Sequence, residues 1–226
     1  MSAALALLPL VVWGTLVGLD LVSVPQMMIA RPIVAGPVAG ALLGDLATGL
    51  ALGVVFELFQ YDILPVGAAR YPEYGPATVA AVSAAHGAGG VAGLGLGTCV
   101  GLVTGYLGGI GIQVVRRLNS RATHAVAARL EAGDTRALVR LHLAGIGRDA
   151  LRAALVTLGG LVLAALVQGV LARALAVRGV ALLDATAGGA ALAAGAAGIL
   201  RLVGRGPSLR WFAAGVVGGV VLAWLR

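Results

Sequence analysis

Long apolar stretches recur along this chain, and they constrain its fold more than any other feature of the sequence. A helix needs about 20 mainly apolar residues to cross a bilayer. Stretches near that length occupy residues 3–19, 33–59 with one interruption, 91–115, 153–172, 180–203 and 212–225. With 60% hydrophobic residues and a mean hydropathy of +1.01, a water-soluble globular domain is excluded. Because an open sheet cannot satisfy its backbone in lipid, the sequence predicts an all-α, polytopic membrane protein.

The basic residues are concentrated in one polar connection. All 16 of them are arginine, and half lie between Arg116 and Arg152. Cytoplasmic loops carry such an excess, so we interpret residues 116–152 as a cytoplasmic connection and not as a nucleic-acid-binding surface. The pattern over 120–143, interrupted at Gly133-Asp134, predicts amphipathic helices at the membrane surface. The chain then divides into an N-terminal membrane region (1–115) with the candidate site, this connection (116–152) and C-terminal membrane helices (153–226).

Glycines recur at intervals of four residues within the apolar stretches. The series are Gly36, Gly40 and Gly44; Gly49 and Gly53; and Gly93, Gly97, Gly101, Gly105 and Gly109. This spacing places them on one face of a helix, where the missing side chains let a second helix approach closely. We interpret these glycines as packing residues and not as ligand-binding residues.

Proline and glycine interrupt the apolar pattern between residues 31 and 76. Arg31-Pro32 is typical of a helix start, and the pieces over 33–43 and 45–59 are each short for a full span. Two such pieces in succession are typical of the discontinuous helices of transporters. The following "PVGAARYPEYGP" excludes a continuous helix. Irregular backbone at membrane depth is tolerated only where protein or a water-filled cavity satisfies it.

Acidic residues within these apolar segments are candidates for a functional site. Ionisable groups at membrane depth are costly, which marks Asp20, Asp45, Glu57 and Glu73. Asp20 also fits a helix end at the interface, and Asp45 fits a cap of the following helix, the interpretation that we favour for it. Glu57 has no nearby turn residue to bring it to water, which favours a site role.

The neighbouring residues suit recognition of hydroxyl groups. Arg70 and Glu73 are close enough in sequence to pair with each other, and Gln26 adds an amide. Carboxylates accept hydrogen bonds from hydroxyls and arginine donates them, while nearby tyrosines offer rings to the apolar face of a sugar. The sequence contains no Ser/His/Asp or Cys/His set, no P-loop and no metal-binding motif. A nucleophile, a metal site and a cofactor are therefore not expected in this chain.

The same region resembles the IIC membrane component of the mannose/fructose/sorbose-type phosphotransferase system. The matching elements are Arg31-Pro32, Leu43-Gly44-Asp45, Thr48-Gly49, Gly53, Glu57-Leu58, Gly67-Ala68-Ala69 and Pro72-Glu73. The resemblance implies a multi-pass protein of the cytoplasmic (inner) membrane that binds a hexose or related sugar. It implies that the sugar is presented to a IIB partner for phosphorylation, and that the phosphorylated residues belong to the IIA and IIB carriers.

The resemblance also implies partners and a set of site residues. A IID subunit would complete the membrane complex, as an oligomer of IIC–IID pairs. The expected sugar-binding residues are Glu57, Glu73, Arg70, Gly67, Ala68, Ala69, Asp20, Gln26 and Asp45.

Two other functions remain open from the sequence. One is a carrier that is uncoupled from phosphotransfer and driven by ions, with Glu57 binding a proton. The other is a membrane scaffold that packs a partner through its small-residue faces. In all three cases the chain itself supplies no catalytic nucleophile.

Overall fold

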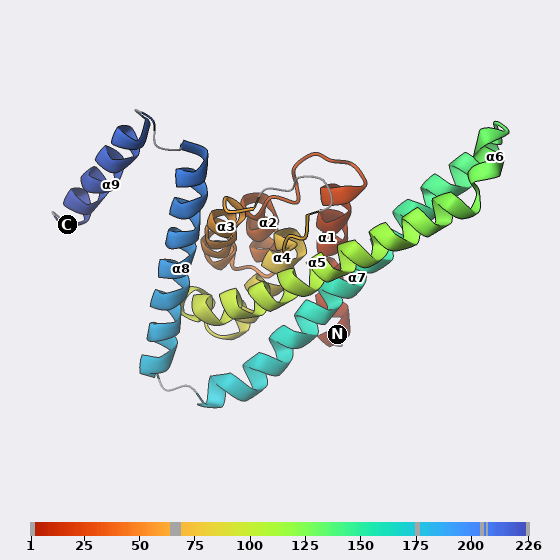
Figure 1. Cartoon of the computed structure of the whole chain (residues 1–226). Helices are drawn as coiled ribbons and strands as arrows, with labels where there is room; N and C mark the ends of the chain where they lie inside the picture. Colours follow the sequence, from red (N-terminus) through yellow and green to blue (C-terminus); the bar gives the residue numbers. More distant parts are fainter. Residues whose placement is uncertain (1–2, 64–68, 175–176, 204–205, 207, 225–226) are drawn as a thin grey trace.

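In the computed structural model, every regular element among the described residues (3–63, 69–174, 177–203, 206 and 208–224) is a helix (Figure 1). The elements in chain order are α1 (Ala3–Val22), α2 (Pro32–Leu42), α3 (Leu46–Gln60), α4 (Tyr74–Gly87), the 3-10 turn η1 (Gly90–Gly93), α5 (Leu94–Ala125), α6 (Ala127–Glu131), α7 (Thr135–Ala174), α8 (Val177–Val203) and α9 (Ser208–Trp224). The predicted all-α class is confirmed.

Helix α4 forms the centre of the molecule. Almost all of its residues are buried, and α1, α2, α3, α5 and α7 all contact it. Phe56 of α3 packs against Tyr74 at the start of α4, with ring centroids 5.5 Å apart. A helix covered on every side needs apolar or small residues all round, and α4 consists mainly of alanine, valine, glycine and threonine. The apolar stretches above do not include this helix, because it is short and its small residues are only moderately apolar.

The predicted discontinuous hairpin is present as α2 and α3. These helices have 11 and 15 residues, which at 1.5 Å per residue gives about 16 and 22 Å, less than the ~30 Å of a bilayer core. Pro32 occupies the first turn of α2, as its position after Arg31 predicts. Backbone meets backbone between the two helices, since a Cβ added to Gly40 would lie 2.8 Å from the Cα of Gly49. The glycine spacing therefore serves close packing between these helices, as predicted. The prediction is wrong for Gly44, which lies in the turn after α2 with a φ of +72° and nothing within 4 Å of its Cβ position.

The longer glycine series begins in η1 and continues along α5, and α4 at the centre of the molecule packs against it. A Cβ at Gly97 would lie 2.6 Å from the carbonyl oxygen of Ala81 on α4, and one at Gly105 would lie 3.2 Å from the Tyr74 ring. A Cβ at Gly109 would clash with the carbonyl oxygen of Tyr71. Both α4 and the segment that leads into it therefore pack against this face of α5.

The Arg-rich connection is an extension of two membrane helices. Helix α5 continues to Ala125 and α7 begins at Thr135, so both run unbroken through the boundaries predicted near 116 and 152. Their ends form an arm with α6 at its tip (Figure 1). The helices predicted over 120–143 are therefore the end of α5, the short α6 and the start of α7.

The arm turns at Gly133, whose φ of +78° is a conformation that glycine adopts readily. Asp134 then caps α7 by accepting a hydrogen bond from the Ala137 amide at 3.0 Å. This bond, together with those from Arg129, lowers the pKa of the Asp134 carboxyl. The predicted interruption at Gly133-Asp134 is confirmed.

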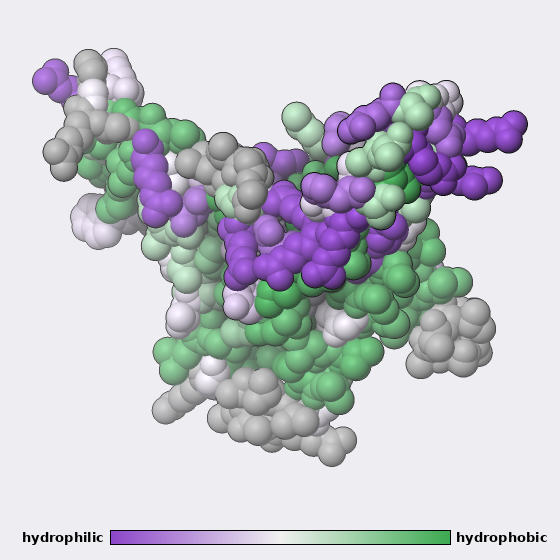
Figure 2. All heavy atoms as spheres, turned by 45° about the vertical axis from the view of Figure 1, so that its right-hand side comes forward, coloured by the Kyte–Doolittle hydropathy of each residue, from purple (hydrophilic) through white to green (hydrophobic). Residues whose placement is uncertain are grey.

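Among the described residues, three helical segments are long and apolar enough to cross a membrane, and they cover Gly90–Ala125, Thr135–Gly169 and Gly179–Val203. Shorter apolar helices lie at Leu7–Val22, Pro32–Leu42, Leu46–Gln60 and Ser208–Leu222. Hydrophilic residues gather along the upper side of the molecule and on the arm, whereas hydrophobic residues cover the sides below (Figure 2). This distribution is typical of a protein with one polar end projecting from the bilayer.

Candidate functional site

A cavity lies where the broken helices meet, between the last turn of α1, the 23–31 loop and the end of α3. It has a volume of about 220 Å³ and is lined by Asp20, Leu21, Gln26, Met28, Ala30, Arg31 and Gln60. A second cavity of about 40 Å³ shares Leu21, Ala30 and Gln60 with it and extends to Tyr71, Pro72, Tyr74 and Gly75. Together they form a cleft, which we call the hairpin cleft, with several polar side chains in a mainly apolar surface, beside the irregular 23–31 loop.

Arg31 supplies the positively charged group of this cleft, and Glu57 is paired with it. Glu57 is 8% exposed, and its Oε1 is paired with the Arg31 guanidinium. Its Oε2 accepts a hydrogen bond from the Ile33 amide at 3.2 Å, at the start of α2. Glu57 thus ties α3 to the first turn of α2, and the residue that faces the cleft is Arg31, whose side chain is 40% exposed. Pairing makes a buried carboxylate tolerable, because an isolated one carries a large desolvation cost.

Asp20 organises the loop that forms the wall of the hairpin cleft. Its Oδ1 accepts a hydrogen bond from the Met27 amide at 2.6 Å, and its Oδ2 accepts one from the Ala30 amide at 3.0 Å. The side chain is almost fully buried, so these bonds compensate for its lost hydration. Asp20 therefore fixes the shape of the loop as well as lining the cavity.

Amides and aromatic rings complete the lining. Gln26 lies in the loop with a φ of +59°, and Gln60 lies one turn after Glu57 on α3. Tyr71 and Tyr74 line the smaller part, and the ring centroid of Tyr61 lies 6.0 Å from the Arg31 guanidinium carbon. The cleft thus combines donors and acceptors with ring faces, a combination that suits a polar molecule with apolar faces.

Glu73 belongs to a different, fully buried cluster. Its Oε2 is paired with Nη1 of Arg152 on α7, and Arg152 also donates from Nε to Asp149 at 2.7 Å. Arg152 Nη2 donates to the Gly18 carbonyl of α1 at 3.0 Å, and Ser23 donates its hydroxyl to Asp149 at 2.6 Å. The predicted pairing of Glu73 with Arg70 is wrong, because the Glu73 side chain points into the core toward α7. This buried cluster joins α1, α4 and α7.

The predicted site residues just before Glu73 lie outside the hairpin cleft or outside the described residues. Arg70 is exposed and lines a separate pocket of about 150 Å³ with Tyr106 of α5. Ala69 is exposed, and its carbonyl accepts hydrogen bonds from Gln113 at 3.3 Å and Arg116 at 3.4 Å. Gly67 and Ala68 lie outside the described residues. The structure therefore does not bring Arg70 and Ala69 into the hairpin cleft.

Asp45 lies at the opposite end of α3 from Gln60. It caps α3 as the sequence indicates, accepting hydrogen bonds from the Thr48 amide at 3.2 Å and from the Thr48 hydroxyl at 2.8 Å. His86 Nδ1 at the end of α4 lies 3.1 Å from the same carboxylate. Asp45 therefore stabilises the tip of the hairpin and lies apart from the cleft.

Sequence reasoning missed three residues that the structure places at these sites. The sequence indicates Arg31 as a helix start and as part of the family motif, although an arginine beside a broken helix is itself a signal for polar binding. Gln60 lies three residues after Glu57, close to the same helix face. Arg152 had no local signal, because its partner Glu73 lies 79 residues earlier in the chain.

Comparison with known proteins identifies the family. Residues 4–224 match the family described as "PTS system sorbose-specific iic component". The chain is 30% identical over 125 residues to the sorbose-specific EIIC component of Klebsiella pneumoniae, covering 55% of this chain and 46% of that protein. It is 25% identical over 125 residues, with the same coverage of both chains, to the mannose-specific EIIC component of Escherichia coli K12. The matches span about half the length of these relatives.

Solved structures share the fold. One, titled "Structure of membrane protein", matches with a TM-score of 0.73 at 20% identity and covers 100% of this chain and 96% of the other. The mannose transporter ManYZ, solved by cryoEM with microcin E492, contains a chain that matches with a TM-score of 0.60 at 21% identity, covering 97% and 87%. The resemblance noted from the motifs is confirmed: this chain is a member of the sorbose-type IIC family of the phosphotransferase system.

Proposed function

We propose that this protein is the sugar-translocating IIC subunit of a phosphoenolpyruvate-dependent phosphotransferase system, and that the hairpin cleft binds the sugar. The observation that supports this most directly is the pairing of Glu57 with Arg31 beside that cleft. A partly enclosed space with polar side chains beside a broken helix is where transporters of many folds bind their cargo. As a member of its family, the protein resides in the inner membrane.

The chemistry of the lining favours a polyhydroxylated molecule. Arg31 donates hydrogen bonds, while Gln26 and Gln60 both donate and accept them. Hydroxyl groups of a sugar act in both roles, so they satisfy these side chains together. The rings of Tyr71 and Tyr74 would cover an apolar face of the sugar. Because the matched relatives are named for sorbose and mannose, these two sugars are the first to test.

Phosphotransfer requires partners that this chain does not supply. A IID subunit would complete the membrane complex, in an oligomer of IIC–IID pairs, and a docked IIB would phosphorylate the sugar with phosphate passed on from IIA. The ManYZ chain of similar fold comes from a mannose transporter of that name, which supports a two-component membrane complex. The positive charge of the Arg-rich arm supports a cytoplasmic location for that end of the molecule, where phosphorylation would then take place.

The test is sugar uptake by the assembled system with a Glu57→Gln variant. This substitution keeps the shape of residue 57 but removes the charge that holds Arg31. Since a hydrogen bond to a charged group contributes about 1.5–3 kcal/mol, uptake and sugar binding are expected to fall by at least about tenfold. Sugar binding to the purified IIC–IID pair, measured by calorimetry, separates a binding defect from a coupling defect.

Glu131→Gln is the matched control, because it makes the same change at an exposed position on α6. It is expected to leave uptake unchanged. A folded Glu57→Gln protein with parental uptake contradicts the proposed site. Uptake by the parent protein that needs the membrane potential but no phosphoenolpyruvate contradicts the coupling to phosphotransfer.

A further inference from the structure

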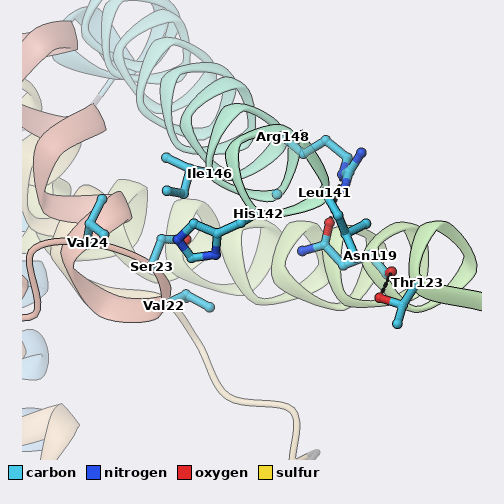
Figure 3. A pocket seen from close by; sticks show the side chains of 10 residues that line it. Val22, Ser23, Val24, Asn119, Thr123, Leu141, His142, Ile146 and Arg148 are labelled. Carbon is cyan, nitrogen blue, oxygen red and sulfur yellow. Dashed lines mark hydrogen bonds between the residues drawn. The ribbon is translucent and has the colours of Figure 1, made fainter. Parts of the chain in front are cut away.

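A second polar cavity lies on the other side of the last turn of α1. It has a volume of about 300 Å³ and opens between that turn, α5 and α7 where the arm leaves the helix bundle. Figure 3 shows His142 of α7 beside Ser23, with Asn119 and Thr123 on α5 at the other end of the cavity. We call it the arm cavity. Asp20 lines the hairpin cleft and Ser23 lines the arm cavity, so less than one helical turn separates the two.

Arg148 gives the arm cavity an uncompensated positive charge. Its Nε donates to Asn119 Oδ1 at 2.7 Å, a neutral partner. Its Nη2 is shielded from water and has no hydrogen-bond partner among the described residues. Buried donors in native proteins are nearly always paired, and a missing ion or ligand is a common explanation where they are not. Arg148 Nη2 is therefore a donor that lacks a hydrogen-bond acceptor among the described residues.

The neighbouring acids do not neutralise Arg148. No acidic residue is among those that line the arm cavity. The nearest acid in sequence, Asp149, is almost fully buried and accepts hydrogen bonds from Arg152 and Ser23. Its charge is thus compensated on the side of α7 that faces the core. The arm cavity is left with an arginine and neutral polar groups.

We propose that the arm cavity binds the phosphate group of a small molecule. Arginine is favoured for phosphate because its planar guanidinium donates several parallel hydrogen bonds. Asn119, Thr123 and His142 place further polar groups around the same space. Two sources share this chemistry: a phosphorylated sugar leaving the neighbouring cleft, which rests on the proposed function, and the headgroup of an anionic phospholipid, which does not.

The experiment measures binding of three probes to the full-length protein, purified in detergent and freed of lipid. The probes are inorganic phosphate, glucose 6-phosphate and a short-chain, soluble phosphatidylglycerol, each followed by calorimetry. Arg148→Gln is expected to weaken binding by about tenfold or more, because a charged hydrogen bond is lost. Preference for glucose 6-phosphate supports the sugar source, and preference for phosphatidylglycerol supports the lipid source.

A second variant tests the arm cavity without removing Arg148, in case the Arg148→Gln protein does not fold. Asn119→Asp keeps an oxygen in place to accept the hydrogen bond from Arg148 and adds a negative charge to the arm cavity, so it is expected to abolish phosphate binding in a folded protein. Arg140→Gln is the matched control, since Arg140 is exposed on the same helix eight residues earlier. It removes the same charge outside the cavity and is expected to change affinity by less than about twofold.

The outcomes separate this site from the sugar site. Glu57→Gln is expected to bind the phosphate probes as the parent does, even if it no longer binds sugar. If no probe binds, or if Arg140→Gln weakens binding as much as Arg148→Gln, the proposal is overturned, because binding is then absent or due to the general charge of the arm.

Discussion

Glu57 and Glu73 are both acids buried in a membrane protein, yet their surroundings give them different roles. Glu57 holds Arg31 at the edge of a cavity, where the Arg31 side chain remains 40% exposed and available to a ligand. Glu73 lies with Arg152 and Asp149 in a cluster whose side chains are at most 4% exposed. We infer that the first acid serves binding and that the second serves the assembly of three helices.

The buried cluster should be essential for stability. Arg152→Met leaves Glu73 and Asp149 buried without their cation, and breaking such a pair costs about 3–5 kcal/mol. The free energy of unfolding in mixed micelles is expected to fall by that amount. Adding Glu73→Gln should restore part of it, because one uncompensated charge is removed. Arg140→Met, at an exposed position, is the control. An Arg152→Met variant as stable as the parent contradicts a structural role for the cluster.

At the scale of elements, backbone contact between short helices shapes the site. The α2–α3 hairpin brings Arg31 at one helix start next to Glu57 near the other helix end, and Asp45 with His86 fastens its tip. This arrangement depends on glycines, because any side chain between α2 and α3 would separate them. The packing of the hairpin therefore sets the distance between Arg31 and Glu57.

A methyl group in this contact should disrupt the hairpin. Gly40→Ala places a Cβ against the backbone of α3, and overpacking of this kind costs about 1–3 kcal/mol. We expect lower thermal stability and weaker sugar binding together, because separation of the helices moves Arg31 away from Glu57. Gly159→Ala on α7 is the control, since nothing lies within 4 Å of its Cβ position. Equal stability of the two variants would show that the hairpin does not depend on this contact.

At the scale of the whole molecule, long and short helices have different tasks. The three segments that are long and apolar enough to span a membrane contact a centre built from α2, α3 and α4, which are short and rich in small residues. The long α5 and α7 also extend beyond this centre as the arm (Figure 1). The hairpin cleft and the arm cavity both lie near the end where the arm leaves, so binding and phosphate chemistry are proposed for the same side of the protein.

The orientation of the chain can be tested with single cysteines. In a Cys99→Ser background, which removes the only native cysteine, Arg136→Cys reports on the arm and Val91→Cys reports on η1, just before the opposite end of α5. A membrane-impermeant maleimide should label position 91 in intact cells and position 136 only after permeabilisation. Labelling of position 136 in intact cells would place the arm outside and contradict the proposed side of phosphorylation.

Much of the fold follows from local patterns. Apolar length predicts residence in the bilayer, Pro32 and the short pieces predict the discontinuous hairpin, and the glycine spacing predicts its close packing. These properties depend on residues near one another in sequence, so they can be read from it. Local patterns did not predict helix α4, because its burial comes from the five helices around it and not from strong apolar character of its own.

The partners of the charged residues were decided by the tertiary structure alone. The sequence marks Glu57 and Glu73 as costly and therefore important, but Arg31 lies 26 residues from the first and Arg152 lies 79 residues from the second. Arg70, the nearest arginine to Glu73, points elsewhere. Burial cost is a property of the residue and its segment, whereas ion pairing depends on which helix faces meet, and that is determined only when the helices pack.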